Sequence, residues 1–207
     1  YVDRLPPCNQ TCPAGEDIQA WLAFAQAGEH RSAWDKLTEE NPMPAIHGRV
    51  CYHPCETSCN RGFVDSPVSI HAVERFLGDL AISSDWQFVR PSKSTGKRIL
   101  VVGAGPSGLS AAYQLARKGH HVEIFEAGPI AGGMMNFGIP TYRLPRDILR
   151  AEIGRIEKLG VEIRLNKKVT DILAEKLAGG FDAVFIAIGA HIGRKTDIPA
   201  RDASKIL

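Results

Sequence analysis

The sequence lacks the long hydrophobic runs that a membrane protein needs. No apolar stretch approaches the ~18 residues of a spanning helix, and the first residues, YVDRLPPCNQ, have no basic head followed by an apolar stretch as a signal peptide would. It also lacks an excess of charge of one sign, because the formal net charge is +2 and Lys and Arg are spread along the chain. Electrostatics therefore favours neither nucleic acid nor an anionic membrane as a partner. We expect a cytoplasmic protein.

The chain also has no internal repeat and no low-complexity tract. Its 207 residues suffice for one large domain or two modest ones, and its hydrophobic content of 44% suits a globular protein with a core. The composition changes near Arg90, since all five cysteines and all three tryptophans precede it. Segments typical of an α/β fold follow. We therefore expect an α-helical domain over 1–90, a polar linker over 91–97 and an α/β domain over 98–207.

The first half reads as short helices separated by prolines. Asp17 can cap one helix, a second spans about 32–40 and stops at the NPMP stretch, and a third begins at Ile70 with its apolar residues on one stripe. Glu74 lies on that apolar stripe. A buried charge needs a partner, so Glu74 is a candidate functional residue.

The second half alternates strands with helices. We expect strands over 97–102, 120–127, 161–165 and 182–190. We expect helices over 107–118 and 146–159, and a further short helix opened by Thr170 or Asp171. An irregular glycine-rich loop connects the second strand to the second of these helices.

A glycine-rich loop lies between the first of these strands and its helix. Gly103, Gly105 and Gly108 form the G-x-G-x-x-G signature: the first permits a tight turn, the second lets the backbone approach a pyrophosphate, and the third lets helix and strand pack closely. The helix N-terminus then offers N–H groups to phosphates. Glu126, 23 residues after Gly103, can bond ribose hydroxyls. This acid favours FAD or NAD over NADP, while a purely steric glycine turn is the alternative.

The five cysteines fall into two groups. Their spacings are C-x3-C and C-x3-C-x3-C, formed by Cys8, Cys12, Cys51, Cys55 and Cys59. Cysteines four residues apart share a helical face, so neighbouring thiolates can reach one metal centre or two adjacent ones. In a reducing compartment such a cluster indicates metal binding or redox chemistry.

Zinc is the main rival to iron–sulfur clusters. Thiolates suit it and His47 and His53 lie nearby, but the C-x2-C knuckles that zinc sites favour are absent. A radical S-adenosylmethionine site would need C-x3-C-x2-C, and this run has one residue too many. The remaining alternative is five buried cysteines without any ligand.

The combination of these motifs resembles a known family. The segments CNQTCPAGEDI, GRVCYHPCETSCNRG, SIHAVERFLGD, VVGAGPSGLSAAYQLARKGHHVEIFEA, GGMMNFGIPTYRLPRDIL and FDAVFIAIGA closely resemble the small subunit of NADPH-dependent glutamate synthase and its relatives. The N-terminal part of dihydropyrimidine dehydrogenase is similar too. The resemblance implies a multi-domain fold: an α-helical, helical ferredoxin-like [4Fe-4S] domain followed by a Rossmann-like FAD-binding domain. This chain would hold only the first part of the latter.

The resemblance also implies two sets of metal ligands. The first cluster would use three cysteines and a carboxylate, namely Cys12, Cys51, Cys55 and Glu74. The second would use Cys8 and Cys59, plus two cysteines that the family supplies a few residues before Cys8. Residues 1–7 contain no cysteine, so this sequence holds only part of that second set.

For the flavin, the resemblance assigns the pyrophosphate to the loop Gly103–Gly108, with Pro106 and Ser107, and the ribose to Glu126. Further flavin contacts would come from Gly133, Met134, Arg143, Val169, Ala187 and Gly189. Arg143 has an ordinary alternative as a surface ion pair. No catalytic side chain is assigned, because the cofactors carry the chemistry.

The implied function is electron transfer from NAD(P)H through FAD and [4Fe-4S] to a partner oxidoreductase or synthase subunit. A second G-x-G-x-x-G for NADPH and a closing flavin segment are not found in this sequence. We therefore expect the chain alone to be unable to oxidise NADPH and to bind FAD weakly or not at all. The alternative is a zinc-stapled helical interaction module fused to a nucleotide-binding domain. A simple FAD hydroxylase or disulfide reductase would leave the N-terminal cysteines unexplained.

Overall fold

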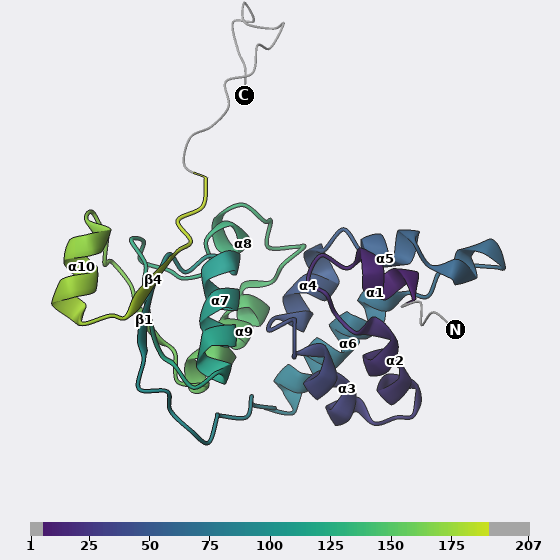
Figure 1. The fold of residues 1–207 in the computed structure, drawn as a ribbon. Coiled ribbons are helices and arrows are strands. Elements are labelled where there is room, and N and C mark those ends of the chain that lie inside the picture. Colours follow the sequence, from purple (N-terminus) through teal and green to yellow (C-terminus); the bar gives the residue numbers. More distant parts are fainter. Residues whose placement is uncertain (1–5, 191–207) are drawn as a thin grey trace, which may run out of the picture.

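A computed structural model of the chain describes residues 6–190 (Figure 1). Its first half is helical, and prolines at the first turn start three of its short helices. The helices are α1 (Pro7–Thr11), α2 (Ile18–Gln26), α3 (His30–Leu37), α4 (Pro44–Val50), α5 (Pro54–Thr57) and α6 (Ile70–Ser83), with a 3-10 turn, η1 (Asn60–Phe63). The Asp17 side chain accepts a hydrogen bond from Ala20 N at 3.3 Å, as expected for the cap of α2.

Helix α3 differs from the expected span of 32–40. It begins at His30 and ends at Leu37, and the Thr38 hydroxyl donates to the carbonyl of Trp34 at 2.8 Å just beyond its end. Asn41 precedes Pro42, and the ring of a proline disfavours the helical conformation in the residue before it. The chain therefore leaves the helix before this position instead of reaching residue 40.

Helices α4 and α6 cross at very short distance. A Cβ added to Gly78 would lie 2.2 Å from Ala45 N, and one added to Gly48 would lie 2.5 Å from Arg75 N. Because only glycine leaves this room, the two backbones can approach closely. The crossing brings the end of α4, where Cys51 follows, toward the middle of α6, which carries Glu74.

The second half is a parallel sheet with helices. Its elements are β1 (Arg98–Val102), α7 (Pro106–Arg117), β2 (His121–Phe125), α8 (Met134–Phe137), α9 (Arg146–Lys158), β3 (Glu162–Arg164), α10 (Ile172–Gly179) and β4 (Ala183–Ile186). The strand order is β3-β2-β1-β4, and every pair is parallel. Asp171 is the residue that caps α10, since its carboxylate accepts from Leu173 N and Ala174 N.

The two central strands, β1 and β2, are buried on both faces after their first residue, which explains their mostly apolar sequences. On one face Val101 and Ile124 pack with α7 and α9, and on the other Leu100 and Val102 pack with Phe181. In Figure 1, α7 and α9 lie between the sheet and the helical half, while α10 lies at the opposite side. Strand β4 is shorter than the expected 182–190 because its partner β1 ends at Val102, opposite Ile186.

Buried contacts join the two halves. Met43 and Ile46 of the helical half belong to the same apolar cluster as the core of α7 and α9. Glu152 of α9 is fully buried and accepts from Ala45 N of α4 at 2.8 Å, while Arg155 donates to its other oxygen at 2.7 Å. The two halves therefore share a continuous core. Within residues 6–190, no helix is long and apolar enough to cross a membrane.

Candidate functional site

The five cysteines lie on short elements around the end of α4. Two come from α1 and its C-cap, one follows α4, one lies in α5 and one precedes η1: Cys8, Cys12, Cys51, Cys55 and Cys59. All five are free thiols. Cys8, Cys12 and Cys55 pack against the apolar core formed with α2 and α6. Cysteines from α1, its C-cap and α5 thus meet at one apolar cluster.

The charges that act on each thiol divide the cysteines into a group of three, Cys12, Cys51 and Cys55, and a pair, Cys8 and Cys59. Burial raises the pKa of the Cys55 thiol to about 12, and Cys12 and Cys51 add to the rise. Burial also raises the pKa of Cys51, with Glu74 and Cys12 acting in the same direction. For Cys8 the pKa is raised by burial and further by Cys59. The charge of Glu74 thus acts on Cys51 of the group of three, and Cys59 acts on Cys8.

These donors suit a metal chemically but are not arranged as a finished site. Within residues 6–190, no three His, Cys, Asp or Glu side chains already surround a position for a metal ion. Thiols with a raised pKa keep their protons until a cation displaces them, so metal binding and the final arrangement of ligands are linked. Three neighbouring thiols and a carboxylate fit iron–sulfur ligation, in which thiolates are the usual donors.

Glu74 has two very different oxygens. The residue is 5% exposed, and Oε1 accepts from Asn41 Nδ2 at 2.7 Å. Oε2 lies 3.8 Å from His53 Nε2, and among the described residues no hydrogen bond reaches it. Burial raises the pKa of Glu74 well above its ordinary value, and the neighbouring Glu16 adds to the rise. The carboxyl therefore ionises readily only where a cation compensates the charge.

A buried polar network surrounds Asn41, which sequence reasoning missed. Asn41 is fully buried, and its Nδ2 donates to Glu16 Oε1 at 3.0 Å as well as to Glu74. Its Oδ1 accepts from Met43 N at 3.1 Å and lies 2.7 Å from His47 Nδ1. Burial lowers the pKa of His47 to about 4, so the ring is neutral and donates its Nδ1 proton to Asn41.

Glu16 is the second carboxyl of this network. Its Oε2 accepts from the indole Nε1 of Trp21 at 3.2 Å, and burial raises its pKa to about 7. Partners 25 and 33 residues away along the chain hold Asn41. No local pattern in the sequence predicts contacts between residues so far apart along the chain.

The glycine loop lies at the carboxyl end of β1, where doubly wound sheets bind their ligands. Gly103 has φ 106°, and a Cβ there would lie 2.4 Å from the carbonyl oxygen of Ala187. A Cβ on Gly108 would lie 1.9 Å from the carbonyl oxygen of Gly103. Around Gly105, by contrast, no atom lies within 4 Å of such a Cβ. The outer glycines thus serve packing, and the middle one leaves open space in front of the exposed Pro106 and Ser107.

Glu126 follows β2 and ties this loop to the sheet. Its Oε2 accepts from Ala104 N at 2.7 Å and its Oε1 accepts from Gly128 N at 2.8 Å. Each carboxylate oxygen has a further lone pair available. The side chain can therefore hold the loop and still accept from ribose hydroxyls.

Three of the further candidates lie beside the glycine loop. A Cβ on Gly133, whose φ is 50°, would lie 2.9 Å from the Cα of Gly105, and the next residue, Met134, is 68% exposed. Ala187 N donates to Val102 O at 2.8 Å, which places this segment next to Gly103. The structure thus brings three separate segments to one edge of the sheet.

Three candidates remain: Gly189, Val169 and Arg143. Gly189, with φ 72°, follows β4 in open space. Val169 packs with the cluster of Leu100 and Phe125 on the face that α10 covers. Arg143 is exposed, and within the described residues it forms no ion pair, contrary to the alternative of a surface ion pair. The pKa of His53 is lowered, mainly by burial and by His71, and the charge of Arg143 adds to that lowering.

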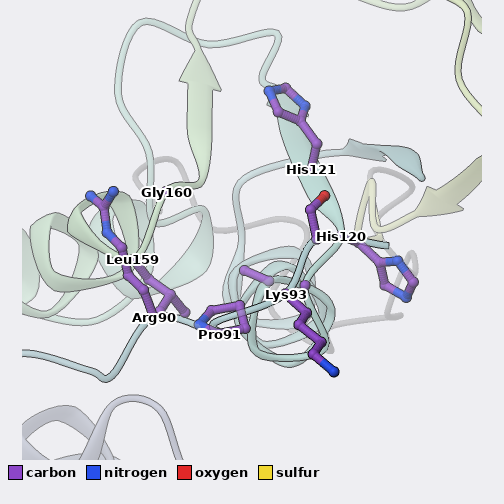
Figure 2. A pocket seen from close by; sticks show the side chains of 10 residues that line it. Arg90, Pro91, Lys93, His120, His121, Leu159 and Gly160 are labelled. Carbon is purple, nitrogen blue, oxygen red and sulfur yellow. The ribbon is translucent and has the colours of Figure 1, made fainter. Parts of the chain in front are cut away.

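A hollow near the linker lies away from these residues. Arg90, Lys93, His120 and Gly160 are among the residues that line it (Figure 2). It lies where β2 begins and α9 has ended, at the amino end of the strands. Doubly wound sheets bind ligands at the carboxyl end, so we do not include this hollow in the candidate site.

Comparison with known protein families matches each half separately. Residues 4–86 match the family described as "Dihydroprymidine dehydrogenase domain II, 4Fe-4S cluster". Residues 101–151 match the family described as "NAD(P)-binding Rossmann-like domain". The two matches confirm the expected fold class, an α-helical iron–sulfur domain followed by a Rossmann-like domain.

Curated relatives cover nearly the whole chain. The β subunit of NADP(+)-dependent formate dehydrogenase from Moorella thermoacetica is 40% identical over 95% of this chain and 31% of its own length. The glutamate synthase [NADPH] small chain of Mycobacterium tuberculosis is 38% identical over 96% of this chain and 41% of its own length. The dihydropyrimidine dehydrogenase subunit PreT of Escherichia coli is 35% identical over 90% of this chain and 46% of its own length. The chain therefore spans less than half the length of these relatives.

Proposed function

Since this chain is a homologue of glutamate synthase small chains, PreT and formate dehydrogenase β subunits, we propose that it is the electron-transfer segment of an NAD(P)H-dependent FAD and iron–sulfur oxidoreductase. One observation carries the proposal. The helical half, which matches a [4Fe-4S] family, shares a buried apolar core with the α/β half, which contains the glycine loop. Electron transfer requires two redox groups at a fixed separation. A continuous core between their binding domains provides that rigidity.

For the metal centre, we propose that Cys12, Cys51, Cys55 and Glu74 hold one [4Fe-4S] cluster. When bound, such a cluster carries single electrons between a flavin and an acceptor. The close crossing of α4 and α6 fixes Cys51 relative to Glu74, and the surrounding apolar core limits access of water. Cys8 and Cys59 offer two thiolates toward a second cluster, whose remaining ligands the described residues do not supply.

For the flavin, we propose that the open space at Gly105 receives the FAD pyrophosphate at the N-terminus of α7, and that Glu126 accepts from the adenosine ribose. Support comes from the free approach at Gly105 and from the position of Glu126 against the loop. Further contacts are proposed for Gly103, Pro106, Ser107, Gly108, Gly133, Met134, Arg143, Val169, Ala187 and Gly189.

In the whole protein, we propose that NAD(P)H supplies the electrons and that a partner oxidoreductase or synthase subunit accepts them. Several relatives are named as small or β subunits, which supports a partner of that kind. The division into 1–90, 91–97 and 98–207 remains our proposal for the domain boundaries. A zinc-stapled interaction module is the weaker candidate, because the relatives are named as NADPH- or NADP-linked oxidoreductase subunits.

The test is cofactor analysis of protein purified without oxygen. We expect iron and acid-labile sulfide in equal amounts, and a decrease of the visible absorption of the cluster on reduction. Bound FAD is expected in the whole protein. Stoichiometric zinc without sulfide would contradict the proposal and favour the interaction module.

A further inference from the structure

Asn41 occupies an unusual position beside the proposed cluster. It lies between α3 and α4, is fully buried, and makes four polar contacts with four different residues. Two of these contacts use its amide nitrogen and two use its oxygen. This uses both N–H groups and both lone pairs of the amide.

The contacts of the oxygen fix the direction of the amide. The backbone N–H of Met43 can only donate, and neutral His47 donates from Nδ1, so both require the Asn41 oxygen as acceptor. The NH2 group must then point the other way, toward Glu16 and Glu74. A rotated amide would place an oxygen against two carboxyl groups and an NH2 group against two donors.

This direction matters for Glu74 because the two carboxyl oxygens receive different partners. Asn41 Nδ2 lies 2.7 Å from Oε1, whereas Oε2 lies on the side of His53 and accepts no hydrogen bond among the described residues. The bond to Oε1 therefore leaves Oε2 as the oxygen that is available to a cation. Outer contacts of this kind orient metal ligands and tune the metal that they bind.

We propose that Asn41 is a positioning residue that presents Glu74 to the iron through Oε2 alone, by holding Oε1 in a hydrogen bond. This inference rests on the proposed role of Glu74 as a cluster ligand. An N–H group on the outer oxygen withdraws electron density from the ligand, which favours the reduced cluster. Removing that N–H lowers the midpoint potential of the cluster.

The test compares Asn41→Leu in two backgrounds. Leucine has a similar volume and no N–H group. In the protein with Glu74, we expect Asn41→Leu to lower the midpoint potential and to change the electron paramagnetic resonance line shape of the reduced cluster. In a Glu74→Cys background, where the ligand has no outer oxygen, the same substitution is expected to change neither quantity.

A second variant covers the case in which Asn41→Leu does not fold. Asn41→Asp keeps an oxygen for Met43 and His47, and its added charge acts in both backgrounds. The expected result is an additional shift in the Glu74 background beyond the shift in the Cys background. Thr38→Val serves as a control, since Thr38 is buried nearby and its hydroxyl bonds only carbonyls of its own helix. It should leave the potential unchanged.

The outcomes separate this inference from the proposed function. If the unmodified protein contains no iron and sulfide, or if Glu74→Cys leaves the spectrum of the cluster unaltered, the proposed role of Glu74 fails. If Glu74→Cys changes the spectrum but both Asn41 variants shift the potential equally in the two backgrounds, or not at all, the positioning role of Asn41 is overturned.

Discussion

Replacing Gly78 by alanine tests whether the close crossing of α4 and α6 assembles the metal site. The new Cβ would lie 2.2 Å from Ala45 N and 2.5 Å from its Cα. Both are backbone atoms and cannot rotate away, so α4 must move by about 1.2 Å to reach the 3.4 Å of ordinary contact. Overpacking of this kind costs up to about 3 kcal/mol, and alanine regains about 1 kcal/mol of helix propensity. We expect a net loss of about 2 kcal/mol in the free energy of unfolding.

The same displacement would reach the metal ligands. Cys51 follows the end of α4, and Ala45 N also donates to Glu152 across the two halves. We therefore expect Gly78→Ala to lower the iron content of protein purified without oxygen, in addition to its stability in urea unfolding.

Gly154 provides the matched control for this substitution. It lies inside α9, and nothing lies within 4 Å of a Cβ added there. Gly154→Ala should therefore stabilise the protein by about 1 kcal/mol and leave the iron content unchanged. If Gly78→Ala proved as stable as the unmodified protein and held as much iron, the assembly role of the crossing would be refuted.

Three further results are expected. In the whole protein, Gly105→Ala should keep normal stability, because its Cβ meets no atom within 4 Å, yet lose FAD on gel filtration. Gly108→Ala, whose Cβ would lie 1.9 Å from a carbonyl oxygen, should lower stability by about 3 kcal/mol in urea unfolding. Equal stability of the Gly105 and Gly108 variants would contradict the assignment of Gly105 to ligand approach and Gly108 to packing. Burial raises the pKa of Glu152 from 4.5 to about 7, so folding favours the protonated carboxyl. The resulting contribution to the free energy of unfolding is fully present below pH 4.5 and is lost as the pH rises through 7. Glu152→Gln should remove this pH-dependent loss of stability, which is on the order of 3 kcal/mol at most. If the stability of the variant and of the unmodified protein changed with pH in parallel, this role of Glu152 would be contradicted.

The α/β half could be predicted closely from the sequence because its signals are local. A buried strand, a glycine loop and a helix follow one another around Gly103, and the strand and helix bounds found there differ from the predicted ones by at most one residue. The strands also alternate with helices in the way that parallel sheets require. The exact end of β4 depended on its neighbour, and sequence alone could not supply it.

The short helices α1, α5 and α8 were not individually predictable. Helices of four or five residues show no readable period, and isolated short helices are unstable in water, so packing decides whether they form. The stripe of α6 did identify Glu74, since a charged residue among apolar ones is a local signal. Its partner Asn41 is 33 residues away, and such pairings follow only from the folded arrangement.

The most direct test of the electron-transfer account is the combined measurement of iron, acid-labile sulfide and zinc in protein purified without oxygen, before and after Glu74→Ala. We predict iron and sulfide in equal amounts in the unmodified protein and a loss of both in the variant, because a carboxylate ligand has been removed. Zinc in place of iron and sulfide, or a full iron and sulfide content after removal of Glu74, would contradict the account.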